Sequence, residues 1–324
     1  MKINIIDIKD KNSWKKIFIN KSGLPSQSHD YAKFCLLNSS EKVYLLDINI
    51  PKFKTFCPVN INQFNGFKIM KSLPGYSGFN IDLDNSILTQ INKYFYKNKI
   101  LSFYFNSSPY VQDKLVEKIK FSSFKNNCYI LKLDNSSIKL KEKINRNIKK
   151  NIIKTEALKI DIKEVSKLDF EIFKKLYIKT CNRLNLNPNS FYKKSALDFL
   201  INNYQNKLIL TAEYKKKIIS VSIFIYEGDY SDYLLNFSDD DYNFSTSSLI
   251  MNSAELLKEK SVKYLNLGGG ISNDDGLEKF KKSFNGDQTK IFSIKMISDN
   301  EIYSKFSENL NNNYFPPFMK WLKK

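Results

Sequence analysis

The chain has 324 residues and a mass of 37.9 kDa, more than one hydrophobic core usually serves, so its length favours two domains. With 42% apolar and 14% aromatic residues and only 10 Gly and 8 Pro, the composition excludes a disordered or collagen-like protein. The net charge of +19 favours polyanionic partners such as RNA, nucleotide-linked substrates or anionic lipid headgroups. It does not establish one, because only Arg146 and Arg183 are arginine, and this lysine-rich balance is also typical of an AT-rich genome.

Cysteine and histidine are too few and too scattered for the commonest metal and catalytic motifs. The four cysteines show no CxxC spacing and His29 is the only histidine, so neither a zinc site nor a His-dependent triad is expected. No apolar run approaches the length of a membrane-spanning helix, and Asp7 and Asp10 interrupt any signal-peptide core. The sequence therefore predicts a cytoplasmic protein without a metal.

Strand-like and helix-like segments alternate along the first half, which predicts a mixed α/β or α+β protein. Strands are expected at residues 2–8, 41–48, 66–71, 101–105 and 127–133, and helices at 11–20, 28–37, 85–97 and 111–120. The turn-rich segment Leu73-Pro74-Gly75-Tyr76-Ser77-Gly78 follows the third strand.

The second half repeats this order of elements. Its strands are expected at 157–162, 207–212, 218–227, 231–237, 263–267 and 290–297, and its helices at 165–184, 190–203, 245–260 and 275–284. The repetition suggests two copies of a similar unit. We expect an N-terminal domain at 1–145, a C-terminal domain at 146–298, and a helix in 299–324 that packs back on the first domain.

A basic helix is predicted where the two halves meet. From residue 138, Leu140, Ile144, Ile148 and Ile152 recur at every fourth position, while residues 139–155 carry seven basic side chains and one acidic. Such a helix either presents a solvated face or faces phosphate groups. In the second case Arg146 is best suited to a bidentate contact.

Three of the ten glycines, Gly268, Gly269 and Gly270, follow the strand at 263–267 and precede a helix. This arrangement exposes backbone N–H groups at the end of a sheet, and Asp274 or Asp275 is placed to cap the helix. The spacing is neither G-x-G-x-x-G nor GxxxxGK[ST], which excludes NAD binding and ATP hydrolysis as interpretations.

The stretch 264–284, YLNLGGGISNDDGLEKFKKSF, resembles the C-terminal part of the FemABX family, in which a strand enters an LGG-type turn and a helix carries a Phe-Lys pair. Here that pair is Phe280-Lys281. The chain is also similar to BioF2-like, GNAT-type acyltransferases of polysaccharide gene clusters. Other matching features are Gln27-Ser28 with Tyr31-Ala32, the turn at 74–78 and the basic helix around Arg146, so the resemblance spans nearly the whole chain.

The resemblance implies an α+β (mixed α/β) fold with two tandem GNAT-like domains, the fold of acyl-CoA N-acyltransferases. FemABX proteins are aminoacyl-tRNA-dependent transferases of peptidoglycan bridge formation. The implied activity is therefore formation of an amide on an amino group of a cell-envelope precursor, a muropeptide or an amino sugar. No permanently bound cofactor is implied; the acyl donor is aminoacyl-tRNA or acyl-CoA, and the acceptor is a nucleotide- or lipid-linked sugar or peptide.

The resemblance also assigns site residues. Lys281 is the candidate for stabilising the oxyanion, with Phe280 packing beside it. Without the resemblance, Phe280 and Phe284 would be the buried pair of an amphipathic helix and Lys281 would face water. The residues expected to bind substrate are Lys33, Tyr76, Arg146, Arg183, Gly268, Gly269 and Gly270.

The sequence does not identify the acceptor-binding lysine or the general base. The lysine that contacts the nucleotide diphosphate in the peptidoglycan enzymes falls near Cys35, two residues from Lys33, so the acceptor need not be a UDP-linked muropeptide. The general base is equally open, because its candidates lie in or beside one acidic loop: Asp232, Asp239, Asp240 and Asp241.

The donor is addressed by one physical argument. Coenzyme A users of this fold bind pyrophosphate with a glycine-rich turn ahead of a helix, because bulky side chains would block the backbone N–H groups. The corresponding segment 242–249, YNFSTSSL, has no glycine, which favours aminoacyl-tRNA over acetyl-CoA.

Two alternatives remain. One is an acyl-CoA-dependent amino-sugar N-acyltransferase of surface-polysaccharide biosynthesis. The other is a non-catalytic, basic RNA- or membrane-surface-binding protein. The C-terminal YFPPFMKWLKK either contacts lipid headgroups, as in a peripheral enzyme at the inner membrane, or packs on the first domain with Trp321 buried. The acyl group and the oligomeric state stay open.

Overall fold

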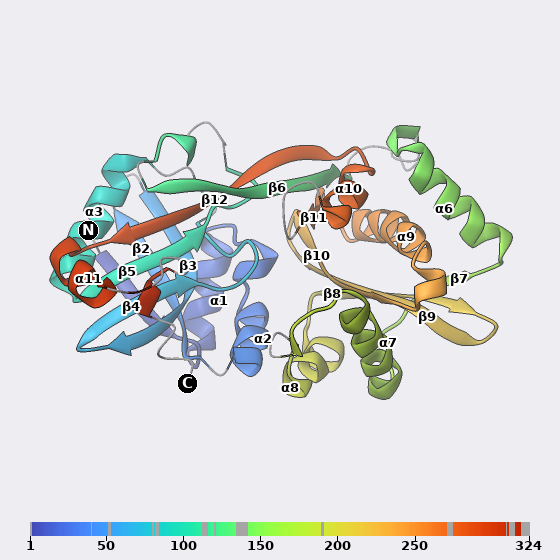
Figure 1. Cartoon of the computed structure of the whole chain (residues 1–324), viewed down its shortest axis with the longest axis horizontal. Helices are drawn as coiled ribbons and strands as arrows, with labels where there is room; N and C mark the ends of the chain where they lie inside the picture. The colour runs from blue at the N-terminus through green and yellow to red at the C-terminus, as the bar shows by residue number, and fades with distance from the viewer. Residues whose placement is uncertain are drawn as a thin grey trace. The chain divides into compact units, whose positions relative to one another are not determined.

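The computed structural model in Figure 1 describes residues 2–39, 41–50, 53–79, 81, 84–111, 116–119, 121–133, 142–188, 191–270, 275–308, 310 and 315–318. The chain divides into two compact units. Unit 1 contains Met1–Lys125 and Lys290–Lys324, and unit 2 contains Asn126–Thr289.

Unit 1 is built on a sheet whose strands follow the order β1-β2-β3-β4-β5-β12. All neighbours are antiparallel except β4 and β5, which are parallel. The strands are β1 (Lys2–Asp7), β2 (Val43–Ile50), β3 (Phe53–Phe64), β4 (Phe67–Ser72), β5 (Ile100–Asn106) and β12 (Asp287–Ile297). The helices are α1 (Lys11–Asn20), α2 (His29–Ser39), α3 (Asn85–Lys97) and α11 (Asn300–Ser307).

Unit 2 repeats this plan with the strand order β7-β8-β9-β10-β11-β6, in which β10 and β11 form the parallel pair. The strands are β6 (Ser122–Lys132), β7 (Asp161–Glu164), β8 (Lys207–Tyr214), β9 (Lys217–Glu227), β10 (Tyr230–Ser238) and β11 (Tyr264–Gly268). The helices are α6 (Arg146–Ala157), α7 (Phe170–Arg183), α8 (Lys194–Asp198), α9 (Ser245–Glu259) and α10 (Gly276–Lys282).

The sixth strand of each sheet comes from the other half of the sequence. β12, near the C-terminus, pairs with β5 in unit 1, whereas β6, from the first half, pairs with β11 in unit 2. The units therefore divide at 125/126 and 289/290. The boundaries expected from the sequence, 145/146 and 298/299, differ because a pattern along the chain shows that a strand exists but not which sheet it completes.

Helices cover both faces of the unit 2 sheet (Figure 1). On one face α9 packs against the sheet and α6 packs against α9, around a core that includes Leu210, Phe224 and Leu249. On the other face the Phe173 and Tyr177 rings of α7 contact Phe237 of β10 edge to face.

The basic helix begins later than its pattern suggests. Asn145 is the N-cap of α6, because its side-chain oxygen accepts from the backbone N–H groups of residues 147 and 148. The helix α6 then runs from Arg146 to Ala157. Ile148, Ile152 and Thr155 form its inner face. The predicted start at residue 138 lies outside the described residues. The strand expected from residue 157 begins at Asp161 instead, because α6 continues to Ala157.

One strand was missed by the sequence analysis, and one other predicted element was wrong. β3 was not predicted, because Pro58 interrupts it, has no N–H and is rare inside sheets; here Pro58 lies opposite Leu45 of β2. The single helix expected at 190–203 is α8 followed by a π-helical turn, Phe199–Asn203. The helix expected at 111–120 falls partly outside the described residues.

The C-terminal region contributes α11, which packs on unit 1 through Ile302, Tyr303 and Phe306. The rings of Tyr303 and Phe306 contact Phe318, which belongs to the same cluster as Leu101. Trp321, expected to be buried there, lies outside the described residues.

Candidate active site

The parallel pairing of β10 with β11 in unit 2 ends near the start of β10. Their pairing covers three residues and ends at Asp232 opposite Asn266, while β10 continues along β9 to Ser238 after a bulge between Tyr233 and Leu235. β11 ends two residues later, at Gly268. An opening at the carboxyl ends of diverging parallel strands is a common place for ligands in α/β sheets.

The glycine turn at this point depends on the absence of side chains at two positions. Gly268 has φ +73°, a left-handed conformation that glycine adopts without strain. A Cβ on Gly269 would lie 1.9 Å from the carbonyl oxygen of Asn127, so β6 approaches the turn too closely for any side chain. Gly270 accepts a 3.1 Å hydrogen bond from Asn126 Nδ2.

Lys281 is buried against this turn. Asp275 caps α10 by accepting from the backbone N–H of Glu278, and the helix then directs Lys281 inward and Lys282 into solvent. Lys281 is 8% exposed, and its Nζ donates a 2.7 Å hydrogen bond to the carbonyl oxygen of Gly269. Burial lowers the pKa of Lys281 to about 8, while Cys128 and Asp275 act in the opposite direction.

Phe280 stands beside this lysine as part of the hydrophobic core. Its ring contacts Phe284 edge to face with centroids 5.3 Å apart. The sequence pattern was therefore right that Phe280 and Phe284 form a packed pair. The pattern also predicted that Lys281 faces water, which is wrong, because its side chain is buried. The role that the family resemblance assigns to Lys281 stays a prediction.

Several buried polar side chains lie on α10, β6 and β11, and one of them, Cys128, acts electrostatically on Lys281. Glu278, 3% exposed, accepts from Asn127 Nδ2 at 2.8 Å and from the Tyr129 hydroxyl at 3.0 Å. Next to them, the thiol of Cys128 donates to Asn266 Oδ1 at 2.8 Å. Buried polar groups are costly unless paired, so their concentration at one point of the sheet indicates a functional site.

Sequence analysis missed most of this set. Asn127, Cys128 and Tyr129 belong to β6, and no pattern along the chain indicates that β6 lies beside β11. One signal was present: Asn266 is a polar residue between Leu265 and Leu267 in an otherwise apolar strand.

The aspartates considered as general bases lie in two environments. Asp232 is buried at the point where the strands part, and its Oδ1 accepts a 2.9 Å hydrogen bond from Asn266 Nδ2. Asp239 lies beyond the end of β10, 2.7 Å from Lys179, and this hydrogen bond holds its pKa below the ordinary value. Asp239 is thus a weaker base than a free aspartate.

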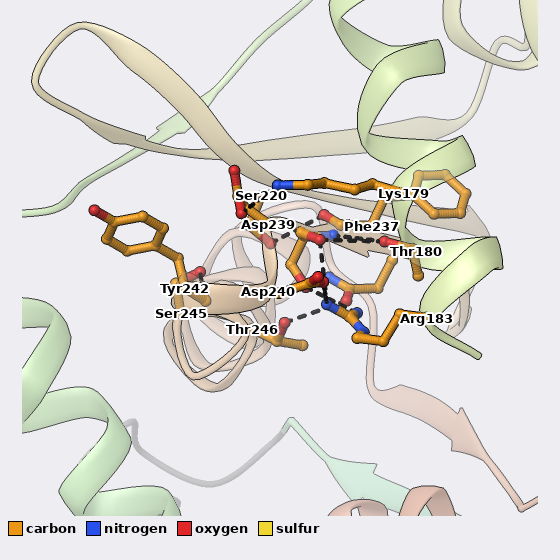
Figure 2. Close-up of polar contacts among 12 residues, drawn as sticks. Lys179, Thr180, Arg183, Ser220, Phe237, Asp239, Asp240, Tyr242, Ser245 and Thr246 are labelled. Atoms are coloured by element: carbon orange, nitrogen blue, oxygen red, sulfur yellow. Dashed lines mark hydrogen bonds and ion pairs between the residues drawn. The ribbon is translucent and has the colours of Figure 1, made fainter. Parts of the chain in front are cut away.

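Arg183 belongs to the second of these environments, shown in Figure 2. Its guanidinium reaches from the end of α7 to Asp240 Oδ1 at 2.6 Å and also donates to the Ser238 carbonyl oxygen. Together with Lys179 and Asp239 these contacts form an ion-pair clamp, defined by Lys179, Arg183, Asp239 and Asp240, that fixes the chain between β10 and α9. The arginine expected to bind substrate therefore has a structural partner.

The start of α9 is packed rather than open. The four side chains of Ser245, Thr246, Ser247 and Ser248 are buried. The backbone N–H groups of Thr246 and Ser247 donate to the carbonyl oxygens of Asn243 and Phe244. Two of the N–H groups that an anion would use are thus engaged by the protein itself.

The remaining predicted residues lie elsewhere. Arg146 is exposed at the first turn of α6. Lys33 is exposed on α2, and Tyr76 is half-buried in the turn at residues 73–78; both belong to unit 1. The two N-terminal segments of the resemblance do meet within unit 1, since the Tyr31 hydroxyl donates to the Pro74 carbonyl oxygen at 3.0 Å.

Other candidate chemistry is limited in the part of the chain that the structure describes. It contains no group of three or more His, Cys, Asp or Glu residues placed to hold a metal ion. His29 Nε2 lies 2.9 Å from the carbonyl oxygen of Ile8. No helix among the described residues has both the length and the apolar character needed to cross a membrane.

Neither a protein-family model nor a curated protein matches the sequence. Among solved structures, FemX is similar with a TM-score of 0.67 and 11% identity over 94% of this chain and 99% of FemX. L-PGS from Bacillus licheniformis has a TM-score of 0.55 and 9% identity over 91% of this chain and 94% of its own. The C-terminal domain of a putative lysylphosphatidylglycerol synthetase from Agrobacterium fabrum has a TM-score of 0.55 and 10% identity over 91% of this chain and 93% of its own. The mixed α/β fold with two GNAT-like domains, expected from the sequence, is confirmed: the chain has the fold of FemX.

Proposed function

We propose that this protein is an N-acyltransferase that forms an amide on an amino group of a cell-envelope precursor, a muropeptide or an amino sugar, with an aminoacyl-tRNA as the donor. The observation that carries the proposal is Lys281, a buried ammonium fixed by the carbonyl oxygen of Gly269, the residue that directly follows β11. The fold shared with FemX, together with the Phe280-Lys281 pair of the resemblance, supports the acyltransferase class.

The chemistry requires a positive charge at the donor carbonyl. The acceptor amine attacks the ester carbon, the C=O electrons move to oxygen, and the tetrahedral intermediate then expels the ribose hydroxyl of the tRNA. The proton lost by the amine leaves with that hydroxyl or passes to water. An ammonium aimed at the oxyanion stabilises this intermediate, and more so in a site without water.

Lys281 suits this role on three counts. Its ammonium has three N–H donors, and among the residues that the structure describes Gly269 is its only acceptor, which leaves donors for the substrate. Its pKa of about 8 keeps it mostly protonated at pH 7. Its position is set by a helix and a sheet rather than by a long loop, so the charge is already oriented.

Two observations support aminoacyl-tRNA over acyl-CoA. The segment before α9 lacks glycine, and the N–H groups of Thr246 and Ser247 at the start of α9 are already bonded. The acceptor class rests on the resemblance to FemABX proteins.

A ligand panel followed by turnover assays tests the proposal. Thermal stabilisation is measured with acetyl-CoA, coenzyme A, tRNA, UDP-N-acetylmuramoyl-pentapeptide and nucleotide-linked amino sugars. Amide formation is then measured with the donor and acceptor that stabilise the protein. We expect a response to tRNA and to a muropeptide or amino sugar; a response to coenzyme A instead would make the protein an acyl-CoA-dependent amino-sugar N-acyltransferase.

Two neighbouring lysines provide the mutational test. Lys281→Met should lower kcat by about 100- to 1,000-fold, the usual effect of removing an oxyanion donor. Lys282→Met is the matched control, because Lys282 is exposed on the same turn of α10, and it should stay within about twofold of the wild type. Equal activity of both variants would remove Lys281 from the chemistry, and turnover by neither variant nor wild type with any donor would leave a binding protein.

A further inference from the structure

Asn266 is an amide placed in the middle of a hydrophobic strand. It is 1% exposed, and its neighbours Leu265 and Leu267 are fully buried in the core of unit 2. An amide without hydrogen-bond partners in such a place would destabilise the fold. The Asn266 amide in β11 therefore requires specific hydrogen-bond partners.

Asn266 has a partner for each polar atom, and the partners fix its orientation. Oδ1 accepts from the backbone N–H of Gly268 at 2.7 Å and from the Cys128 thiol at 2.8 Å, while Nδ2 donates to Asp232 Oδ1 at 2.9 Å. The Gly268 N–H requires an acceptor and the Asp232 carboxylate requires a donor. Both therefore select the same orientation of the amide.

The hydrogen bond to Gly268 lies at an irregularity of the sheet. The register between β11 and β6 shifts between Asn266 and Gly268, so Leu267 is an extra residue in a β-bulge. Bulges often aim a side chain or end a pairing beside a functional site. Here the Asn266 side chain closes the bulge over two residues, and the chain then turns at Gly268 with φ +73°.

The next carbonyl along the chain holds Lys281. Gly269 follows the bulge directly, and its carbonyl oxygen accepts from Lys281 Nζ at 2.7 Å. We propose that Asn266 is a positioning residue: through the bulge and the Gly268 turn it aims the Gly269 carbonyl oxygen that fixes the Lys281 ammonium, and Asp232 holds the Asn266 amide in the required orientation. This inference rests on the proposed function for its catalytic meaning, but not for its structural content.

The first experiment reads the position of Lys281 without any substrate. Competitive acetylation with acetic anhydride across a pH series, analysed by mass spectrometry, reports how each lysine titrates, and the exposed Lys282 serves as the internal reference. In the wild type Lys281 should titrate near pH 8. In Asn266→Leu the anchor moves, so Lys281 should titrate higher and react more like Lys282.

The control is a buried amide far from α10 in the sequence. Asn60 of β3, in unit 1, is buried and donates to the Lys42 carbonyl oxygen at 3.3 Å. Asn60→Leu should lower the melting temperature and leave the titration of Lys281 unchanged. An unchanged titration in Asn266→Leu as well would overturn the proposal.

A reciprocal exchange keeps the test usable if Asn266→Leu fails to fold. Asn266→Asp retains the acceptor for Gly268 but places a carboxylate against Asp232, and we expect kcat to fall on the order of 100-fold with little change in KM. Adding Asp232→Asn restores one amide and one carboxylate with the same hydrogen bonds, so at least a tenfold recovery of kcat is expected. No recovery would show that the carboxylate at position 232 has its own chemical role and would contradict the purely orienting role given to it here.

The two readouts separate this inference from the proposed function. If wild-type protein turns over none of the donors while Asn266→Leu still changes the titration of Lys281, the proposed function fails and the positioning role stands. If turnover is robust and the titration does not respond to Asn266, only the positioning role fails.

Discussion

Lys281 and Lys282 are chemically identical neighbours that the structure makes different. One lies under the glycine turn, with a backbone carbonyl as its fixed partner, and the other is in water. Partial desolvation makes the Lys281 ammonium a stronger electrostatic partner for a developing negative charge than any surface lysine. The same desolvation makes the charged state costly for the folded protein.

That cost predicts a pH dependence of stability. The folded pKa of Lys281 is about 8 and its ordinary value is 10.5, so below pH 8 both folded and unfolded chains hold the proton and the full penalty is present. Between about pH 8 and 10.5 the folded chain releases a proton that the unfolded chain keeps. Unfolding then takes up a proton, and the free energy of unfolding rises with pH by up to about 3 kcal/mol from this residue.

The measurement is urea unfolding of wild type and Lys281→Met at several pH values between 7 and 10.5. As the pH rises, the unfolding free energy of the wild type should increase relative to that of Lys281→Met. The unfolding free energy of Lys282→Met should change with pH in the same way as that of the wild type. A constant difference between wild type and Lys281→Met would mean that Lys281 is not desolvated.

At the scale of elements, the site is a contact between a turn and a strand. The turn of Gly268 and Gly269 lies against β6. Lys281 of α10, which follows the turn in sequence, donates a hydrogen bond back to it. Loss of the close approach at Gly269 should therefore disturb both stability and chemistry.

A pair of glycine substitutions tests this. Gly269→Ala places a methyl group 1.9 Å from the Asn127 carbonyl oxygen, so the turn must move; we expect a loss of about 1–3 kcal/mol and a fall in kcat. Gly276→Ala, at the first residue of α10, meets no atom within 4 Å and should be neutral or slightly stabilising. Melting curves and turnover of the two variants decide, and equal behaviour would show that β6 does not restrict the turn.

The elements themselves were largely predictable, because strands and helices follow local periodicity. The helix start at Asp275 could be found from a capping residue, and the pair Phe280-Lys281, which we propose as part of the site, from a motif. β3 could not be predicted, because Pro58 interrupts its strand pattern, although Pro58 is paired with Leu45 of β2 in the sheet. Glu278 and Cys128 could not either, because their importance comes from contacts between α10, β6 and β11 that are remote in sequence.

At the scale of the whole molecule, each unit contains one strand that comes from the other half of the sequence. The first half of the chain supplies β6 to unit 2, and the end of the chain supplies β12 to unit 1. A C-terminal domain delimited by sequence pattern alone would therefore lack β6, which belongs to its sheet, and would include β12, which belongs to the sheet of unit 1.

Two fragments of unit 2 should differ accordingly. Residues 126–289 contain the unit with β6, from Asn126 on, beside β11, and should fold as a cooperative monomer. Residues 146–298 lack β6 and retain β12, so the edge of β11 is uncovered and aggregation is expected. Circular dichroism and gel filtration of the two fragments give the answer, and equal solubility and cooperativity would show that β6 is dispensable for unit 2.

The net charge of +19 becomes informative only when it is assigned to a surface. The outer face of α6 carries Arg146, Lys149 and Lys150, all exposed. If the donor is a tRNA that contacts this face, each phosphate contact releases counterions, and the logarithm of the binding constant falls linearly with the logarithm of the salt concentration. Replacing all three by Gln should then reduce the magnitude of that slope by about 2 to 3 and weaken binding at low salt.

The control variant replaces Lys15, Lys93 and Lys97 by Gln, which removes the same charge from exposed positions of α1 and α3. An equal reduction in both triple variants would assign the effect to net charge alone, and an unchanged slope in the α6 variant would exclude this face from the tRNA contact.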